Sequence, residues 1–314
     1  MLVTIKPAGR IKMRPEDFLV QEVVNGKVTQ PFFETRITGA VGEFTSFVLT
    51  KRAISGERAC VEVARQLGIS REAITDYGMK DAQAITAQSI VIEGKFDPSF
   101  QHDQIWLRQI GLAKGRLRHG GHDGNRFKIL VETNAAQPQK GYRFLNLFGP
   151  QRFGDGRVDI GRHLLEGDFE KALEQIQGSM NWQKLQSIAS DYGLDFDEAL
   201  VHPEFKFELG FKVNQWTSWL WNQLAPIVSE VSLQTWSLQT AEQYNEWWDP
   251  VELDAELYKL LHVFHRPVMS EARNIQIVRR ADGIEHNFTL RSGSYATVYL
   301  STLYDLEDVS RARY

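Results

Sequence analysis

Polar and hydrophobic residues alternate in several stretches of the chain, the pattern of strands that bury one face. Residues 11–24 alternate after a proline-led turn, and residues 125–131 alternate again. A strand is also predicted through 89–93, and further strands at 275–278 and 286–300. The pattern therefore places strands in the first half of the sequence and again towards residue 300.

Helical periodicity is clear in two other stretches. Ser55 is the expected N-cap of the first helix, which ends at Gly68 and has an apolar face of Cys60, Val63, Ala64 and Leu67. A short helix is predicted from Ser70. Asp168 is the expected cap of the other clear helix, which ends at Gly178 and buries Phe169, Ala172, Leu173 and Ile176.

The next part of the chain is rich in aromatic residues. Apolar side chains occupy every second position from 205 to 213, a spacing that predicts a strand. These residues are Phe205, Phe207, Leu209, Phe211 and Val213. A helix containing Trp216, Leu220 and Leu224 is predicted after it. Residues 242–256 contain six acidic and no basic side chains, so we expect this segment to face solvent.

The predicted elements are strand-rich, then helix-rich, then strand-rich. At 314 residues the chain is long enough for two domains of about 150 residues each. We therefore expect a sheet domain interrupted by an insertion at about 156–270, with the last strands returning to the first sheet.

Composition is that of a globular protein, with 42% hydrophobic and 24% charged residues. The net charge of −4 is unevenly spread. Residues 1–160 carry 23 basic against 17 acidic side chains, or +6, and residues 161–314 carry 13 against 23, or −10. Such asymmetry is typical of a protein with one surface for a polyanion, and also arises by chance.

Several protein classes are disfavoured by the sequence. No apolar run approaches the ~20 residues needed to span a bilayer, and residues 1–10 lack the apolar core of a signal peptide. Cys60 is the single cysteine, so an intramolecular disulfide and zinc sites built on cysteines are excluded. A cytoplasmic protein without membrane contact is the expected reading.

Four segments combine residues in an unusual way. The longest, 78–88, sets the carboxylate of Asp81 beside the ammonium of Lys80, just after a glycine. The others are 15–18, 124–127 and 146–154. In this order the four segments resemble the signature of the TruD family of pseudouridine synthases, which isomerise uridine in RNA.

The resemblance implies an α+β fold: a pseudouridine-synthase-like catalytic domain with a long mixed, mostly antiparallel sheet, plus a smaller inserted α/β domain. The catalytic domain would comprise 1–155 and 271–314, and the inserted TruD-type domain 156–270. Residues 292–297 match the family's closing strand. The stretch 226–270 departs from the family because it lacks the usual glycine-containing segment and is acidic.

The resemblance also implies an isomerase that acts on tRNA, by family analogy on the uridine at position thirteen of the D arm. The reaction breaks the N1–C1′ bond and joins C5 to C1′ without a change of oxidation state, so neither a cofactor nor a metal is expected. tRNA is the expected partner of a monomeric protein.

Two other functions remain open. One is a non-catalytic RNA-binding or RNA-remodelling protein that uses the same cleft. The other is a hydrolase of glycosidic bonds, which usually needs two carboxylates roughly 5–10 Å apart. No second carboxylate stands out beside Asp81 in the sequence.

Asp81 is the expected catalytic residue. A Gly-x-Lys-Asp sequence alone is typical of a turn. The resemblance assigns its carboxylate to the ribose, where it either attacks C1′ or removes the 2′-proton. Burial disfavours an ionised carboxylate, so a cation is expected nearby, and Lys12 matches the family's active-site lysine. Lys80 contacts phosphate, pairs with a carboxylate or lies in solvent.

Asn125 and Phe127 are the candidates for holding uracil, the amide at its hydrogen-bonding edge and the ring against its face. They are two residues apart on a predicted strand and therefore lie on one side of the sheet. Without the resemblance, Phe127 reads as a core residue.

Basic residues flank the start of this strand on both sides, in a glycine-rich stretch. Such a stretch can follow a phosphate backbone, and the alternative interpretation is a solvated hairpin tip. The candidates are Lys114, Arg116, Arg118 and Arg126. Gln151 and Arg152 in the fourth segment are expected to contact RNA or the catalytic loop. His119 and His122 have no cysteine or carboxylate partners at metal-ligand spacing, so no metal site is expected.

Overall fold

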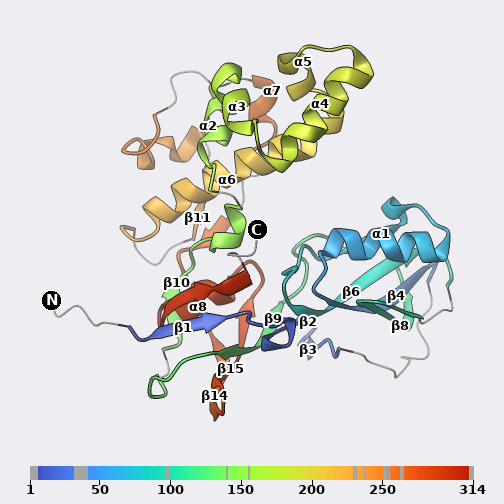
Figure 1. Cartoon of the computed structure of the whole chain (residues 1–314), viewed down its shortest axis with the longest axis vertical. Coiled ribbons are helices and arrows are strands. Elements are labelled where there is room, and N and C mark those ends of the chain that lie inside the picture. The colour runs from blue at the N-terminus through green and yellow to red at the C-terminus, as the bar shows by residue number, and fades with distance from the viewer. Residues whose placement is uncertain are drawn as a thin grey trace. The chain divides into compact units, whose positions relative to one another are not determined.

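The structure, a computed structural model, describes residues 6–31, 42–96, 100–138, 141–154, 156–228, 232–236, 238–249, 253, 255–261 and 265–310. The chain divides into two compact units (Figure 1). The first comprises 1–144 and 271–314, and the second comprises 145–270. The segment 146–154, which the sequence analysis placed before the insertion, therefore falls in the second unit.

The first unit contains a ten-stranded sheet with the order β14-β15-β9-β2-β6-β4-β8-β7, to which β3 adds by pairing with β2 and β5 by pairing with β6. The strands are β2 (Phe18–Val24), β3 (Lys27–Val28), β4 (Phe44–Arg52), β5 (Ile74–Asp76), β6 (Ile85–Glu93), β7 (Phe100–His102), β8 (Ile105–Ala113), β9 (Gly124–Val131), β14 (Arg273–Arg280) and β15 (Gly283–Arg291). The β2–β6 pair is parallel and the other pairs are antiparallel. The predicted α+β class with a mixed, mostly antiparallel sheet is confirmed.

A separate two-stranded sheet joins distant parts of the sequence. β1 (Ala8–Ile11) pairs in parallel with β16 (Asp305–Asp308), with Ile11 opposite Asp308. The strand predicted at 11–24 is thus two strands, because Lys12 has a φ of 59° and a 3-10 turn, η1 (Pro15–Asp17), follows it. The turn redirects the chain into the central strand β2.

The first predicted helix is confirmed as α1 (Gly56–Leu67). Ser55 Oγ accepts the backbone N–H of Arg58, and Gly68 ends the helix in the left-handed conformation. The helix predicted from Ser70 is a single 3-10 turn, η2 (Arg71–Ala73). Figure 1 shows α1 lying along β4, β6 and β8, with which it forms one hydrophobic cluster.

The predicted closing strand at 292–297 is wrong. The strand β15 ends at Arg291, and a turn leads into α8 (Ala296–Ser301). Ala296, Tyr299 and Leu300 are all buried, at the three- and four-residue spacing of a helix face. Together with β2, β9 and β15 they form a second hydrophobic cluster.

A row of polar side chains separates the two clusters on the same face of the sheet. The strand register puts Lys51 opposite Thr86, Thr86 opposite Val20, and Glu22 opposite Asn125. Residues directly opposite each other point to one face. Glu22, Lys51, Thr86 and Gln88 are at most 1% exposed and Asn125 is 9% exposed. A polar strip inside an apolar face costs free energy, so it marks the place to look for chemistry.

The second unit is mainly helical. Its elements include α2 (Asp159–Leu165), α3 (Phe169–Ile176), α4 (Met180–Tyr192), α5 (Phe196–Leu200), α6 (Lys206–Leu224), α7 (Ala255–Tyr258) and the antiparallel pair β11 (Ser232–Gln234) and β12 (His265–Pro267). Asp168 caps α3 by accepting the N–H of Lys171, as predicted. Short strands β10 (Arg143–Leu145) and β13 (Met269–Glu271) pair where the chain passes between the units.

The strand predicted at 205–213 is wrong, because these residues form a 3-10 turn, η4 (Pro203–Phe205), and the start of α6. The buried positions recur every three to four residues, which is a helical period. They are Phe205, Leu209, Val213, Trp216, Leu220 and Leu224. Phe207, which completed the alternating pattern, is 73% exposed.

The acidic segment 242–256 exposes Glu242, Glu246 and Asp249, in agreement with the prediction, while Tyr244 and Trp248 pack into the core of the second unit. Residues 250–252 and 254 of this segment lie outside the described residues. In the part of the chain that the structure describes, no helix has the length and apolar character required to cross a bilayer.

Candidate active site

Asp81 lies in the loop between β5 and β6. Its Oδ1 accepts the backbone N–H of Gln83 at 2.9 Å, so the residue does form the turn that its sequence favours. The same turn fixes the carboxylate, whose side chain is 11% exposed. One oxygen is therefore used to hold the side chain, and the other oxygen, Oδ2, faces a lysine.

That lysine is Lys12, from the turn after β1. Its Nζ lies 2.5 Å from Asp81 Oδ2 and 4.8 Å from the centre of the Phe18 ring, and the side chain is 2% exposed. The predicted cation beside Asp81 is thus present. Lys12 adopts a left-handed backbone conformation, which costs roughly 1 kcal/mol for a residue with a side chain.

A second carboxylate shares this ammonium, which corrects the expectation that none stands beside Asp81. Asp308 Oδ2 lies 2.9 Å from Lys12 Nζ. Ser310 donates to Asp308 Oδ1 from both its backbone N–H and its hydroxyl, at 3.1 and 2.6 Å. The contact joins residues 296 positions apart and depends on the β1–β16 register, so no local sequence signal points to it.

The Asp81 loop also accepts a hydrogen bond from Lys51, a residue that the sequence analysis did not predict. Its side chain is fully buried, and Nζ donates to the backbone oxygens of Asp81 at 2.7 Å and of Ile54 at 2.8 Å. Burial lowers the pKa of Lys51 to about 8, against the opposing effect of the Asp81 charge. No local signal in the sequence marks it, because Lys51 stands between Thr50 and Arg52 at the end of β4.

Of the three alternatives for Lys80, the structure favours pairing with a carboxylate. Lys80 Nζ lies 2.7 Å from Glu22 Oε1, and Glu22 is fully buried. Glu22 Oε2 accepts the N–H of Ser89 at 2.7 Å. Burial raises the pKa of Glu22, and the nearby Lys80 charge opposes that rise. Lys80 also donates to the backbone oxygen of Gly78, which ties it to the loop before Asp81.

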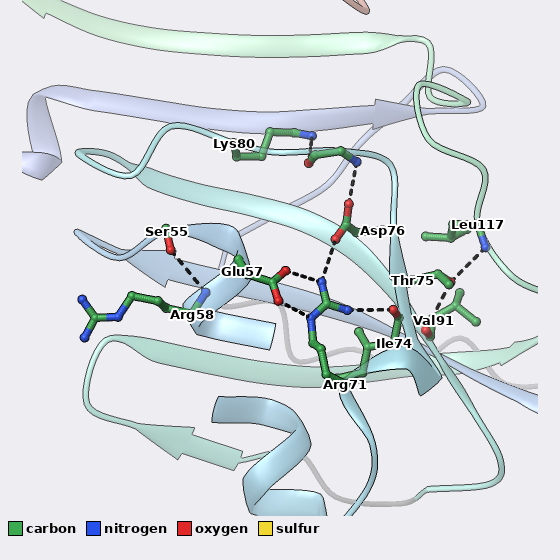
Figure 2. Close-up of polar contacts among 11 residues, drawn as sticks. Ser55, Glu57, Arg58, Arg71, Ile74, Thr75, Asp76, Lys80, Val91 and Leu117 are labelled. Carbon is green, nitrogen blue, oxygen red and sulfur yellow. Dashed lines mark hydrogen bonds and ion pairs between the residues drawn. The ribbon is translucent and has the colours of Figure 1, made fainter. Parts of the chain in front are cut away.

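The β5–β6 loop is anchored to α1 by an arginine (Figure 2). Arg71 Nη2 lies 2.7 Å from Glu57 in α1 and 4.0 Å from Asp76, and its Nη1 donates to the backbone oxygen of Ile74. Asp76 in turn accepts the N–H of Gly78 at 2.6 Å. The loop that carries Lys80 and Asp81 is therefore held at its β5 end.

The predicted basic stretch lies beside this loop. Thr75 Oγ1 accepts the N–H of Leu117 at 3.1 Å, and the backbone oxygen of Tyr77 accepts the N–H of Gly120 at 2.7 Å. Gly78 has a φ of 132°, and a Cβ there would meet the ring of His119 at 2.9 Å, so residue 78 must be glycine.

The basic side chains differ in how free they are. Arg116 pairs with Glu93 and donates to the backbone oxygen of Glu72. Lys114 and Arg118 are exposed, and within the described residues neither makes an ion pair. Arg126 points to the face of the sheet opposite to that of Asn125, because it is the neighbouring residue on β9.

Asn125 and Phe127 share one face, as predicted. Phe127 is 6% exposed and packs in the hydrophobic cluster, with its ring stacked on Phe288 at 5.3 Å. Its contacts are those of a core residue. Asn125 is 9% exposed, and its side chain interacts with the ring of His122.

His122 is a polar residue of this region that the sequence analysis considered only as a metal ligand. It is 8% exposed and lies against the Tyr77 ring, with 5.5 Å between ring centres. Burial and the Lys80 charge lower the pKa of His122 to about 4, so its ring is neutral at pH 7. In the described part of the chain Thr86 Oγ1 and Gln88 Oε1 have no hydrogen-bond partner, whereas the His122 ring interacts with the Asn125 side chain. Buried polar atoms normally have a partner, so Thr86 Oγ1 and Gln88 Oε1 can form a hydrogen bond with a substrate.

Gln151 and Arg152 belong to the second unit. They lie in η3 (Pro150–Arg152), where Arg152 Nε donates to Ser218 Oγ of α6 at 2.9 Å. The Arg152 guanidinium also lies 5.6 Å from the Phe148 ring centre. Arg152 is thus engaged by its own unit, and Gln151 is exposed.

Other candidate sites among the described residues are weaker. No cluster of three histidine, cysteine or acidic side chains arranged to hold a metal ion occurs there. A cavity of about 380 Å³ is lined by Ile54, Arg58, Glu62 and His102 and contains none of the predicted site residues. The notable chemistry is the group of charged side chains around Asp81.

Comparison with known proteins identifies the family of this chain. The family model for tRNA pseudouridine synthase D (TruD) matches residues 4–193. A probable tRNA pseudouridine synthase D of Nanoarchaeum equitans is 37% identical over 177 residues, which cover 52% of this chain and 46% of the relative. One of Thermococcus onnurineus is 34% identical over 189 residues, covering 54% and 42%. The matches thus span less than half of each relative's length.

A solved structure extends the likeness of the fold to nearly the whole chain. The putative TruD protein of Methanosarcina mazei superposes with a TM-score of 0.58 at 17% identity, covering 98% of this chain and 96% of that one. Because the family model alone matches more than half of the residues, the chain belongs to the TruD family of tRNA pseudouridine synthases.

Proposed function

We propose that the protein is a tRNA pseudouridine synthase in which Asp81 acts at the ribose of the target uridine. The observation that carries the proposal is the Asp81 carboxylate held by its own turn and by the buried ammonium of Lys12. An ionised carboxylate in a fixed position is what both routes to pseudouridine require.

The two routes differ in what Asp81 does. As a nucleophile it bonds to C1′ while the N1–C1′ bond breaks, and as a base it removes the 2′-proton to give a glycal. Uracil then turns, and C5 bonds to C1′. Lys12 has the same task in both, because a nearby cation offsets the cost of keeping a carboxylate ionised away from water.

Recognition of the base would fall to Asn125 and His122, whose mutual side-chain contact would be exchanged for contacts with uracil. Asn125 Oδ1 can accept the uracil N3–H, and the neutral ring of His122 can donate to or accept from a carbonyl or N–H group. Phe127 lies on the same face of the sheet as Asn125, within the hydrophobic cluster. The target nucleotide would have to leave its stack to reach these groups.

The RNA backbone would be held by the basic side chains next to the Asp81 loop. Lys114 and Arg118 are the exposed candidates, and Arg116 lies in the same stretch. Arg126, and Gln151 and Arg152 of the second unit, are further candidates for RNA binding. By family analogy the target is the uridine at position thirteen of the D arm. The partner is tRNA, and the protein acts as a monomer without cofactor or metal.

Hydrolysis of the glycosidic bond is the second candidate, favoured by the Asp81 and Asp308 pair. Both Oδ2 atoms lie within 2.9 Å of Lys12 Nζ, a separation compatible with two catalytic carboxylates. However, the ammonium occupies the space between them where a sugar would have to lie. Isomerisation therefore accounts better for the arrangement.

The test is the Asp81→Asn variant. Wild-type protein should convert a uridine of tRNA into a carbodiimide-reactive pseudouridine, and Asp81→Asn should abolish this while its circular dichroism and unfolding temperature stay close to those of wild type. The matched control is Asp103→Asn, an exposed aspartate elsewhere in the same unit, which should be fully active.

Free uracil released in place of pseudouridine would favour the hydrolase. Full activity of Asp81→Asn would refute the assignment of Asp81, and RNA binding without any product would favour the non-catalytic alternative.

A further inference from the structure

We infer that Asp308 is a positioning residue that acts through Lys12: by sharing the ammonium, it keeps Lys12 in place and leaves Asp81 only partly neutralised. The inference rests on the proposed function, and it concerns a residue outside the four motif segments. Its basis is the contact of one buried ammonium with two carboxylates.

The geometry fixes Asp308 firmly. It ends β16, directly opposite Ile11, the residue before Lys12. Both hydrogen bonds from Ser310 go to Oδ1, so Oδ2 is directed at the ammonium. The side chain is 12% exposed, close to the value of 11% for Asp81. The two carboxylates are thus similar in burial and approach Lys12 at similar distances.

The charges explain why a second anion is useful. Lys12 and Asp81 alone would form a neutral pair in which the ammonium stabilises the resting carboxylate strongly. Such a carboxylate is a poor nucleophile and a poor base. With Asp308 present, one positive charge is divided between two negative ones, so Asp81 keeps more of its reactivity.

Asp308 has a second role during the reaction, when the charge of Asp81 changes. In the nucleophilic route, Asp81 Oδ2 bonds to C1′, and the electron pair of the broken C1′–N1 bond leaves with uracil. In the glycal route, Asp81 takes the 2′-proton, and the C2′–H electrons form the C1′–C2′ double bond as the same bond breaks. Asp81 has lost its charge in both intermediates.

At that stage Lys12 would be a buried ammonium without its main partner, which is costly. Asp308 remains as its counter-ion, so Lys12 does not move. When C5 bonds to C1′, Asp81 is released as a carboxylate, in the glycal route after returning its proton to C2′. The C5 proton ends on N1, and the Asp81 carboxylate again contacts Lys12.

The experiment is a double-mutant cycle of Asp308→Asn and Lys12→Met, with single-turnover and steady-state rates of pseudouridine formation on tRNA. Asp308→Asn should lower kcat roughly tenfold, the size expected for contacting residues, and leave KM within about twofold of wild type. In the Lys12→Met background, Asp308→Asn should cause no further loss, because its effect passes through the ammonium. Asp308→Glu, which keeps the charge, should retain most of kcat.

Glu307→Gln is the matched control. Glu307 lies on the same strand and pairs with Arg10 of β1 at 3.3 Å, on the exposed side. It should leave kcat unchanged. If Asp308→Asn does not fold, Ser310→Ala replaces it, since it removes one of the two hydrogen bonds that hold the Asp308 carboxylate without removing its charge. We expect a roughly threefold loss of kcat that disappears in Lys12→Met.

Several outcomes would overturn the inference while leaving the proposed function intact: wild-type kcat in Asp308→Asn, an equal loss in Glu307→Gln, or a full additional loss in the Lys12→Met background. A wild-type protein that forms no pseudouridine would instead remove the proposed function, and this inference with it. The two failures are therefore distinguishable.

Discussion

At the scale of the residue, two lysines contact different parts of Asp81. Lys12 contacts the carboxylate, whereas Lys51 contacts the backbone oxygen of the same residue. The Lys12 contact balances the charge of the Asp81 carboxylate, and the Lys51 contact fixes the position of the Asp81 backbone. Removing either should impair the reaction, but for different physical reasons.

Lys51→Met should lower kcat by about ten- to a hundredfold, because the Asp81 loop loses its donor and small misplacements are costly in catalysis. The unfolding free energy should also change with pH. Because the pKa of Lys51 is about 8 in the folded state and 10.5 in the reference state, the unfolded chain binds more protons between these values. Stability of wild type relative to Lys51→Met should therefore rise by roughly 3 kcal/mol from pH 8 to 10.5.

Urea unfolding at several pH values measures this difference. Arg52→Gln is the matched control, since Arg52 is the next residue of β4 and pairs with Glu16 at the surface. It should be as active as wild type and show no such pH dependence. A pH-independent difference between wild type and Lys51→Met would contradict the assigned pKa.

The contact between Asp81 and Lys12 could be expected from the sequence, because Asp81 lies in one of the four segments and Lys12 stands three residues before another. The sequence could not reveal Asp308, since strand register across almost the whole chain creates its contact with Lys12. Glu22 and Lys80 form a pair that was one of three open alternatives, and only the fold decided between them. Contacts made through register escape any reading of local sequence.

At the scale of the element, periodicity predicted β2, β6, β9, β14 and β15 of the large sheet and the capped helices α1 and α3, but not the long strands β4 and β8. The failure at 205–213 has a clear physical cause. In 205–213 apolar residues occupy every second position, as in a strand. Three of them, Phe205, Leu209 and Val213, are also four residues apart, as on one face of a helix. Phe207 was counted as buried although it faces solvent. Tertiary packing against α2 and its neighbours selects the helical face.

α2 and α6 pack so closely that one added methyl group between them should change the stability of the second unit. A Cβ on Gly161 would lie 2.2 Å from the backbone oxygen of Lys212, so Gly161→Ala should destabilise the second unit by about 1–3 kcal/mol or more. Gly210, in the middle of α6, has no atom within 4 Å of such a Cβ. Gly210→Ala should stabilise the unit by about 0.5–1 kcal/mol.

Tryptophan fluorescence during urea unfolding measures both changes. Seven of the eight tryptophans lie in 145–270, so the signal reports mainly on the second unit. Pseudouridine synthesis is not needed for this readout. Equal stability of the two alanine variants would contradict the close α2–α6 contact.

At the scale of the whole molecule, residues 1–160 carry a net positive charge and residues 161–314 a net negative charge. The excess of basic residues in 1–160 coincides with the part of the sequence that supplies Asp81, Lys12 and the stretch with Lys114 and Arg118. The acidic residues Glu242, Glu246 and Asp249 lie in the second unit. A protein with a net charge of −4 can therefore still present a positive surface to RNA.

Replacing Lys114 and Arg118 together by glutamine should weaken tRNA binding at low salt. The slope of log K against log salt concentration should fall in magnitude by about 1.5, because each phosphate contact contributes roughly 0.7–0.9. Filter binding or fluorescence anisotropy between 50 and about 200 mM salt measures this slope.

The control is Arg58→Gln combined with Lys95→Gln, which removes the same number of exposed positive charges. Within the described residues the side chains of Arg58 and Lys95 make no ion pair. The control should leave the slope unchanged. An equal fall in both double variants would mean that total charge, and not the 114–118 stretch, determines binding.

The parallel pairing of β1 with β16 has a consequence for how the protein matures on the ribosome. Lys12 is synthesised 296 residues before its second anionic partner, Asp308. The contact between them can therefore form only after residue 308 has left the ribosome. We expect the completed charge group, and with it full turnover, only from that point on.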